Sequence, residues 1–302
     1  MRFGKLMALA LAALMLLGGC RRSEKEPSGE PVHIRDLAVC GDQVWHLFQE
    51  DGTLTLIRDG VTVKEIPDAA GPRFDAAGNA CWYREDGTLV RYALADGNIQ
   101  KIGSAEMAPL IITGRYALLG GGKSAVHRLD LADGTVAELK NLPQSFRLLA
   151  TQGDLIYMDH YARRTISVYD AAGDTLTDLW QYESDRQPLM TGAVLDGALY
   201  FAGTGGGLWR LDLESAGAEP IQVSKKTPVA MTAGEAELIC ALKEYEDDLG
   251  FCVGVDRDAP VELARWEKSG YFLNGSCLLT VSGGKGACAV TTGTDVFEFK
   301  LN

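Results

Sequence analysis

The chain has 302 residues, of which 46% are hydrophobic and 23% are charged. This balance is typical of a globular protein, because a disordered chain has fewer apolar residues and a larger charge imbalance. The formal charge of −12 argues against a nucleic-acid partner, since such binding neutralises phosphates with Lys and Arg. One large β domain and two ordinary domains are both compatible with this length.

The first twenty residues have the layout of a secretory signal. Arg2 and Lys5 form a basic start, and residues 6–17 follow as an apolar stretch without charge. Such a stretch is too short to stay in the bilayer as a membrane-spanning helix. We therefore expect the protein to be exported.

The apolar stretch ends in Leu17-Gly18-Gly19-Cys20, which resembles the lipobox of bacterial lipoproteins. The resemblance implies that residues 1–19 are a signal peptide and that Cys20 becomes the first residue of the mature chain. It also implies that Cys20 carries acyl chains such as palmitate, and more than one chain gives stable anchoring. An ordinary signal peptide that happens to contain Cys20 is the alternative.

Residues 20–31 are polar, contain Pro and Gly, and have no apolar run. This composition suits a flexible tether that lifts a domain off a membrane. The remaining residues, 32–302, are expected to form that domain. The expected location is the cell membrane, or the outer membrane where the host has one.

Short segments rich in Val, Leu, Tyr, Thr and Trp fill the chain after residue 31, separated by Gly-containing turns. They predict β-strands rather than helices. A small residue followed by an apolar strand recurs about every 39 residues. It marks seven units, at Gly41, Gly78, Gly114, Gly153, Gly197, Ala236 and Gly275.

A second marker ends a strand in a turn that contains Asp or Asp-Gly. It occurs in residues 91–97, 128–134 and 210–213, and in the same phase in residues 168–170 and 255–256. An Asp side chain bonds nearby backbone amides and Gly supplies a positive φ, so the chain can reverse into another strand.

Seven units of four short strands are typical of an all-β fold, the β-propeller. The predicted blades are residues 33–70, 71–108, 109–145, 146–186, 187–227, 228–270 and 271–302. Six or eight blades also fit the pattern. Residues 33–39 fit either the inner strand of the first blade or an outer strand that completes the last.

This repeat resembles that of diverse bacterial propellers akin to TolB and of surface lipoproteins of unknown function. The resemblance covers nearly the whole mature chain and implies the propeller shape. It rests on the period and the style of the turns. The Gly-His and Trp-Asp pairs of WD repeats, the Asp box of sialidases and the repeat motif of quinone-dependent dehydrogenases are absent. The family therefore implies no activity.

Six cysteines remain besides Cys20, an even number that permits disulfides in an exported domain. Cys240 and Cys252 flank one predicted hairpin, and Cys277 and Cys288 flank another, so each pair is a candidate disulfide. The alternative is that all six are buried thiols that act as small apolar residues. A metal site is not expected, because the sequence has no Cys-x-x-Cys and its four His are scattered.

Basic residues gather at one mouth of the predicted central channel, where the connections between blades and the loops between second and third strands meet. They are Arg73, Arg147, Arg163, Arg164, Arg186, Lys225, Lys226 and Lys268, with His160, Tyr161, Phe146, Tyr182, Trp266 and Tyr271 beside them. We interpret them as a funnel that attracts an anionic ligand. The alternative is that Arg and Lys are simply common in loops.

The favoured interpretation is a membrane-anchored, extracytoplasmic binding module of the cell envelope. Its ligand would be an envelope protein, a peptidoglycan fragment or an anionic glycan. The alternatives are an assembly partner in an envelope complex, and an enzyme that acts on carbohydrates or peptides with its site in the funnel. The sequence has no Gly-x-Ser-x-Gly or His-Glu-x-x-His motif, so no catalytic residue and no cofactor is predicted.

Overall fold

The computed structural model describes most of the chain after the leader and tether. The described residues are 33–104, 107–120, 125–183, 187–215, 217–244, 249–255, 260–266, 277–291 and 295–301. Every regular element in these residues is a strand. No helix among them is long and apolar enough to cross a membrane.

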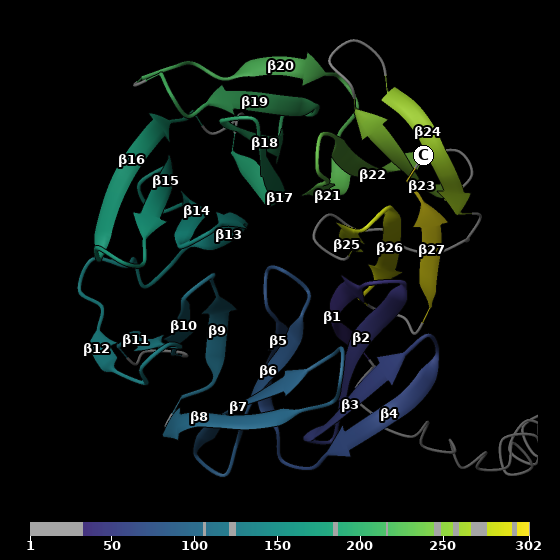
Figure 1. The fold of residues 1–302 in the computed structure, drawn as a ribbon. Coiled ribbons are helices and arrows are strands. Elements are labelled where there is room, and N and C mark those ends of the chain that lie inside the picture. The colour runs from purple at the N-terminus through teal and green to yellow at the C-terminus, as the bar shows by residue number, and fades with distance from the viewer. Residues whose placement is uncertain are drawn as a thin grey trace, which may run out of the picture. The chain divides into compact units, whose positions relative to one another are not determined.

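The 27 described strands form seven small antiparallel sheets arranged in a ring, the blades of a β-propeller (Figure 1). Six blades have four strands each, and the seventh has three in the described part of the chain. Each blade is one continuous stretch of sequence, with its strands hydrogen-bonded in chain order from the innermost to the outermost.

The bounds of the strands follow the blades. Blades 1 and 2 contain β1 (His33–Cys40), β2 (Gln43–Glu50), β3 (Thr53–Arg58), β4 (Val61–Ile66), β5 (Ala70–Phe74), β6 (Ala80–Glu85), β7 (Thr88–Ala93) and β8 (Ile99–Ser104). Blades 3 and 4 contain β9 (Pro109–Ile112), β10 (Tyr116–Leu119), β11 (His127–Asp130), β12 (Val136–Glu138), β13 (Arg147–Gln152), β14 (Leu155–His160), β15 (Thr165–Asp170) and β16 (Thr175–Gln181). Blades 5 to 7 contain β17 (Pro188–Leu195), β18 (Ala198–Gly203), β19 (Leu208–Asp212), β20 (Ile221–Ser224), β21 (Pro228–Ala233), β22 (Leu238–Glu244), β23 (Leu249–Val255), β24 (Pro260–Trp266), β25 (Cys277–Ser282), β26 (Lys285–Val290) and β27 (Val296–Lys300).

The predicted propeller of seven blades is confirmed, and each sheet lies within its predicted blade range except that β5 begins one residue early, at Ala70. One repeat marker is out of phase. Six markers precede the second strand of a blade, but Gly275, itself outside the described residues, precedes the inner strand β25. The equivalent turn in blade 7 is Gly283-Gly284, before β26.

The tight turns have the backbone conformation that their sequences predict. In Asp51-Gly52 the φ angles are 48° and 78°, and in Asp196-Gly197 they are 48° and 67°. Two successive positive φ angles define the type I′ turn, whose twist matches that of antiparallel strands. The second marker works as expected, since the Asp130 carboxylate accepts a hydrogen bond from the Ala132 amide at 2.9 Å. These hairpins are therefore specified locally.

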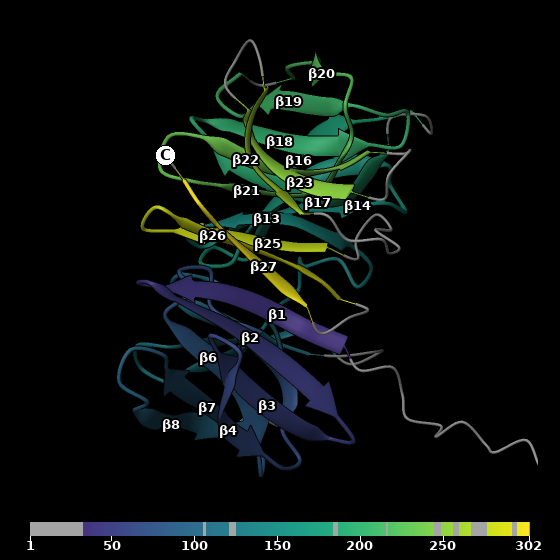
Figure 2. The same ribbon diagram turned by 90° about the vertical axis from the view of Figure 1, so that its right-hand side faces the viewer.

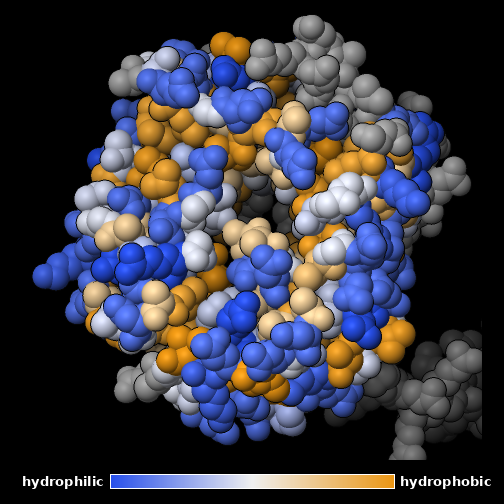
Figure 3. All heavy atoms as spheres, viewed as in Figure 1, coloured by the Kyte–Doolittle hydropathy of each residue, from blue (hydrophilic) through white to orange (hydrophobic). Residues whose placement is uncertain are grey.

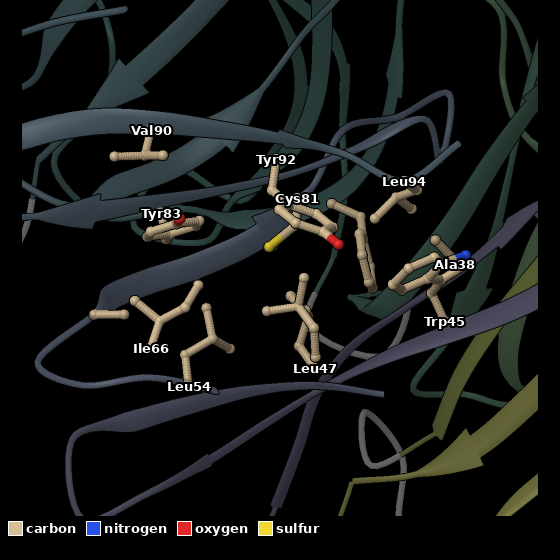
Figure 4. Close-up of a cluster of buried hydrophobic side chains, with 13 residues drawn as sticks. Ala38, Trp45, Leu47, Leu54, Ile66, Cys81, Tyr83, Val90, Tyr92 and Leu94 are labelled. Atoms are coloured by element: carbon tan, nitrogen blue, oxygen red, sulfur yellow. The ribbon is translucent and has the colours of Figure 1, made fainter. Parts of the chain in front are cut away.

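Neighbouring blades are held together by apolar side chains buried between their sheets. Figure 4 shows one such cluster, with Trp45, Leu47 and Leu54 from blade 1 against Cys81, Tyr83 and Tyr92 from blade 2. The rings of Trp45 and Tyr92 meet edge to face, with centroids 6.3 Å apart. Because alternate residues of a strand face opposite sides, each blade can contribute to one cluster on each side.

Buried and half-buried carboxylates add polar links between blades. The Asp154 carboxylate, in blade 4, accepts hydrogen bonds from the Thr113 hydroxyl and the Arg115 amide of blade 3, both at 2.9 Å. The Asp36 carboxylate of β1 accepts the Phe74 amide of blade 2 at 2.8 Å. Each link joins a carboxylate of one blade to a backbone amide of its neighbour.

The ring closes where β1 lies beside β25 and β26 (Figure 2). Residues 33–39 thus belong to the inner strand of the first blade, which settles the alternative left open by the sequence. Ile34, Leu37 and Val39 of β1 are buried against Ala287 and Ala289 of β26.

A single lysine adds a polar clasp to this closure. Lys285 Nζ donates a hydrogen bond to the Asp42 carbonyl oxygen at 2.7 Å and pairs with Glu298 Oε2 at 2.9 Å.

The inner strands leave a hollow at the centre of the ring (Figure 3), where blades 1, 2, 6 and 7 line a pocket of about 240 Å³.

We predict that Lys285→Met weakens the closure of the ring. The change removes the hydrogen bond to Asp42 and the ion pair with Glu298, so the free energy of unfolding should fall by about 1 kcal/mol. Thermal unfolding followed by circular dichroism would measure this loss of stability as a lower melting temperature. Lys300→Met, at an exposed position of β27, is the matched control, and equal melting temperatures for both variants would contradict the role of the clasp.

Candidate functional site

One end of the ring carries the connections between blades and the hairpins between second and third strands; we refer to it as the connection face. Inner strands begin there and second strands end there, because successive strands of each blade are antiparallel. The predicted basic funnel belongs to this end. Four of the predicted site residues, Cys20, Arg186, Lys268 and Tyr271, lie outside the described residues.

In blade 4, the connection face is built around a buried carboxylate. Asp159, at the end of β14, pairs in register with Arg147, at the start of β13, and its side chain has no exposed surface. Oδ1 accepts a hydrogen bond from the Tyr182 hydroxyl. Oδ2 lies 3.9 Å from Arg147 Nη1 and has no hydrogen-bond partner among the described residues.

Burial dominates the protonation of this carboxyl. Loss of solvation raises the pKa of Asp159, and hydrogen bonds from Tyr182 and Gln187 together with the charge of Arg147 only partly oppose it. Burial and the adjoining carboxylate likewise raise the pKa of Tyr182. The Asp159 carboxyl therefore contacts the side chains of Tyr182 and Arg147 and, because it has no exposed surface, cannot contact a ligand.

Arg147 and Tyr161 form the exposed part of this cluster. The Arg147 guanidinium lies 5.3 Å from the centroid of the Tyr161 ring, and 42% of Tyr161 is exposed. A cation over an aromatic ring leaves both groups accessible at their edges. The pair is a flat platform that could receive a sugar ring or an anionic group.

The other predicted residues of this hairpin are engaged within the blade. Arg163 pairs with Asp178 at 2.9 Å. Arg164 has a φ of 55°, and its carbonyl accepts the Tyr182 amide. His160 is half-buried, with a buried Nδ1 that has no partner among the described residues.

The remaining described candidates lie apart from this cluster. Lys225 and Lys226 are exposed in the connection after β20. Phe146 packs on the core between blades 3 and 4. Trp266 stacks on Phe297 with centroids 5.6 Å apart, between blades 6 and 7.

A pocket of about 530 Å³ opens on the connection face where blades 1, 2 and 7 meet. Arg35 and Arg73 line it, together with Gln49 and Thr291 and with the apolar residues Ile34, Gly71 and Pro72. Both arginines are exposed, and none of these lining residues is acidic. On a chain of charge −12, this pocket is locally positive.

The backbone around the pocket is irregular in a way that orients both arginines. Arg35 is the extra residue of a β-bulge, because the register passes from Ile34–Phe48 to Asp36–Leu47. In β5 the register is also shifted between Ala70 and Arg73. Gly71 has a φ of 60°, and a Cβ there would lie 2.7 Å from Ala108 Cβ, so only Gly fits.

Next to the pocket, Asp36 anchors the strand that carries Arg35. Its two carboxylate oxygens accept the Leu37 and Phe74 amides, at 2.9 and 2.8 Å. Burial raises the pKa of Asp36, while these hydrogen bonds and the charge of Arg73 oppose the rise. Sequence reasoning identified Arg73 but missed Arg35, which lies inside a strand and reaches the face only through the bulge.

The cysteines of the two candidate hairpins differ in register. Cys240 pairs with Val253 and Cys252 with Ala241, so those two cysteines are not opposite each other in the ladder. Cys277 and Cys288 have their sulfurs 3.1 Å apart.

Comparisons with known proteins show the fold and no more. No protein-family model and no curated protein matches the chain. Among solved structures, an oligogalacturonate lyase in complex with manganese matches with a TM-score of 0.63 at 13% identity, over 90% of this chain and 90% of that one. The WD40 repeats of RRP9 match with a TM-score of 0.61 at 9% identity, over 91% and 96%. The computationally designed Ika8 protein matches with a TM-score of 0.57 at 16% identity, over 91% and 98%.

The raised pKa of Asp159 predicts a pH dependence of stability. The folded protein keeps this proton at pH values where the unfolded chain has released it. The stabilising contribution is therefore complete below the ordinary value of 3.8 and is lost as the pH rises through the raised value. Asp159→Asn keeps an acceptor for Tyr182 and cannot ionise, so this variant should lose less stability than the wild type as the pH rises.

Melting temperatures between pH 4 and 8 would measure this difference. Asp51→Asn, which changes an exposed carboxyl in a turn, is the control and should follow the wild type. Parallel curves for the wild type and Asp159→Asn would show that the buried carboxyl does not titrate separately.

Proposed function

We propose that this protein is a lipid-anchored, extracytoplasmic binding module that captures an anionic saccharide on the connection face of its propeller. The observation that carries the proposal is the pocket lined by Arg35 and Arg73 without an acidic side chain. Two guanidinium groups match the planar geometry of a carboxylate and can each donate two parallel hydrogen bonds. Gln49 and Thr291 add polar side chains to the pocket, and Gln49 Nε2 donates a hydrogen bond to the Ala69 carbonyl oxygen at 2.9 Å, which fixes the side chain that a sugar hydroxyl would meet.

The scaffold favours binding of a ligand in a fixed geometry. The bulge residue Arg35 is held by the hydrogen bonds of its neighbour Asp36, and Arg73 lies within the electrostatic reach of the same carboxylate. Because the backbone around both arginines is set before a ligand arrives, less conformational entropy is lost on binding. The platform of Arg147 and Tyr161 offers a second contact on the same face.

Two tetrasaccharides test the ligand class: tetragalacturonate, which carries a carboxylate on each sugar, and neutral maltotetraose. The name of the oligogalacturonate lyase with this fold guides the choice of the first. We expect tetragalacturonate to raise the melting temperature of the full chain in detergent, following RT ln(1 + [L]/Kd). Maltotetraose should bind at least tenfold more weakly.

Variants locate the site. Arg35→Ala and Arg73→Gln should each weaken tetragalacturonate binding about tenfold or more, since a hydrogen bond to a charged group contributes roughly 1.5–3 kcal/mol. Lys101→Ala, at an exposed position of the outer strand β8, removes one positive charge elsewhere and should not change binding. Equal binding of both sugars, or equal loss in all three variants, would contradict the proposal, and binding of neither sugar would favour the role of an assembly partner.

The anchor is tested separately. Cys20→Ser should abolish incorporation of labelled palmitate and release the protein from the membrane fraction, because no thiol remains to accept the lipid. Cys40→Ser, a half-buried thiol in β1, should leave both unchanged. Absence of labelled palmitate from the wild type would favour the alternative, an ordinary signal peptide that happens to contain Cys20.

A further inference from the structure

Two cysteines of blade 7 lie with their sulfurs in contact. Cys277 begins β25 and Cys288 lies within β26, and the distance between the sulfurs is 3.1 Å. In the ladder Cys277 pairs with Val290 and Cys288 with Leu279, so the two cysteines are diagonal neighbours on one face of the hairpin. Both are at least nine-tenths buried, in the apolar cluster shared by blades 6 and 7.

We propose that Cys277 and Cys288 form a disulfide in the mature protein. The sulfurs need to approach by about 1 Å to reach the length of an S–S bond. The reaction is exchange with an oxidised thiol–disulfide carrier: the two thiols lose two protons and two electrons, one S–S bond forms, and the carrier's S–S bond is reduced to two thiols. Exported proteins meet carriers of this class.

The two cysteines lie in the blade at which the ring closes, so a disulfide between them would stabilise the closure. Blade 7 has three strands in the described part of the chain, whereas the other six have four. It is also one side of the seam at which the ring closes, through the packing of β26 against β1. A covalent link between β25 and β26 would hold together the hairpin on which this closure depends.

Burial determines when the bond can form. Cys288 has 2% of its surface exposed, so a carrier reaches it only while the hairpin is not yet packed against blade 6. We therefore expect oxidation during folding and slow exchange afterwards. The register gives no comparable arrangement for Cys240 and Cys252: Cys240 pairs with Val253 and Cys252 with Ala241, an offset of one residue that places the two positions on opposite faces of the sheet.

The test uses the full chain in detergent, refolded in a buffer of oxidised and reduced glutathione, then denatured and alkylated with iodoacetamide. We expect two fewer alkyl groups than in the fully reduced chain, and a non-reduced digest in which the peptides of Cys277 and Cys288 are joined. The oxidised protein should melt roughly 5 °C higher than the reduced one. The measurement is independent of any ligand, so its failure would leave the proposed function unaffected.

Serine variants provide the controls. Cys277→Ser and Cys288→Ser should each abolish the difference in melting temperature between the oxidised and the reduced protein, whereas Cys240→Ser should preserve it. If a serine variant fails to fold, the digest of the wild type still decides. Full alkylation of Cys277 and Cys288 after oxidative refolding, or a bond mapped to any other pair of cysteines, would overturn the proposal.

Discussion

Side chains buried between neighbouring blades hold this ring together, because no strand ladder passes from one blade to the next in the described part of the chain. The last of these interfaces joins β1 to β25 and β26, and it brings together residues that are more than 240 positions apart, as in the hydrogen bond from Lys285 to Asp42. The pocket on the connection face depends on this interface, since it takes Arg35 from blade 1, Arg73 from blade 2 and Thr291 from blade 7. The candidate binding site is therefore complete only in the closed ring.

Charge is distributed so that the arginines facing solvent have carboxylates behind them. Asp36 lies beside Arg73, and Asp159 beside Arg147. Burial raises the pKa of both carboxyl groups, and hydrogen bonds to the ionised form and the nearby arginine each oppose the rise. Placing the negative groups inside and the guanidinium groups at the surface lets an acidic protein present a positive site.

Much of the architecture could be predicted from the sequence, because turns are local. Asp-Gly pairs fix several hairpins through positive φ angles, and the recurrence of a small residue before an apolar strand about every 39 residues gives the number of blades. The marker at Gly275 misled because a small residue can precede an inner strand as well as a second one. The role of Arg35 in the pocket could not be predicted from the sequence. It depends on a β-bulge, which arises from how two strands pair and has no signature in the order of residues. The packing of Tyr182 and Trp266 into the blades also depends on tertiary contacts that composition does not reveal.

Each blade is built from one uninterrupted stretch of sequence, and the ring closes by packing alone among the described strands. Among the described strands no sheet combines the first and the last blade, so the order of these blades around the ring has no unique starting point. New termini placed in an exposed connection between blades, with the present ends joined, would leave every described ladder intact. The arrangement thus allows circular permutation, and it makes the whole blade the natural unit for duplication or exchange during evolution.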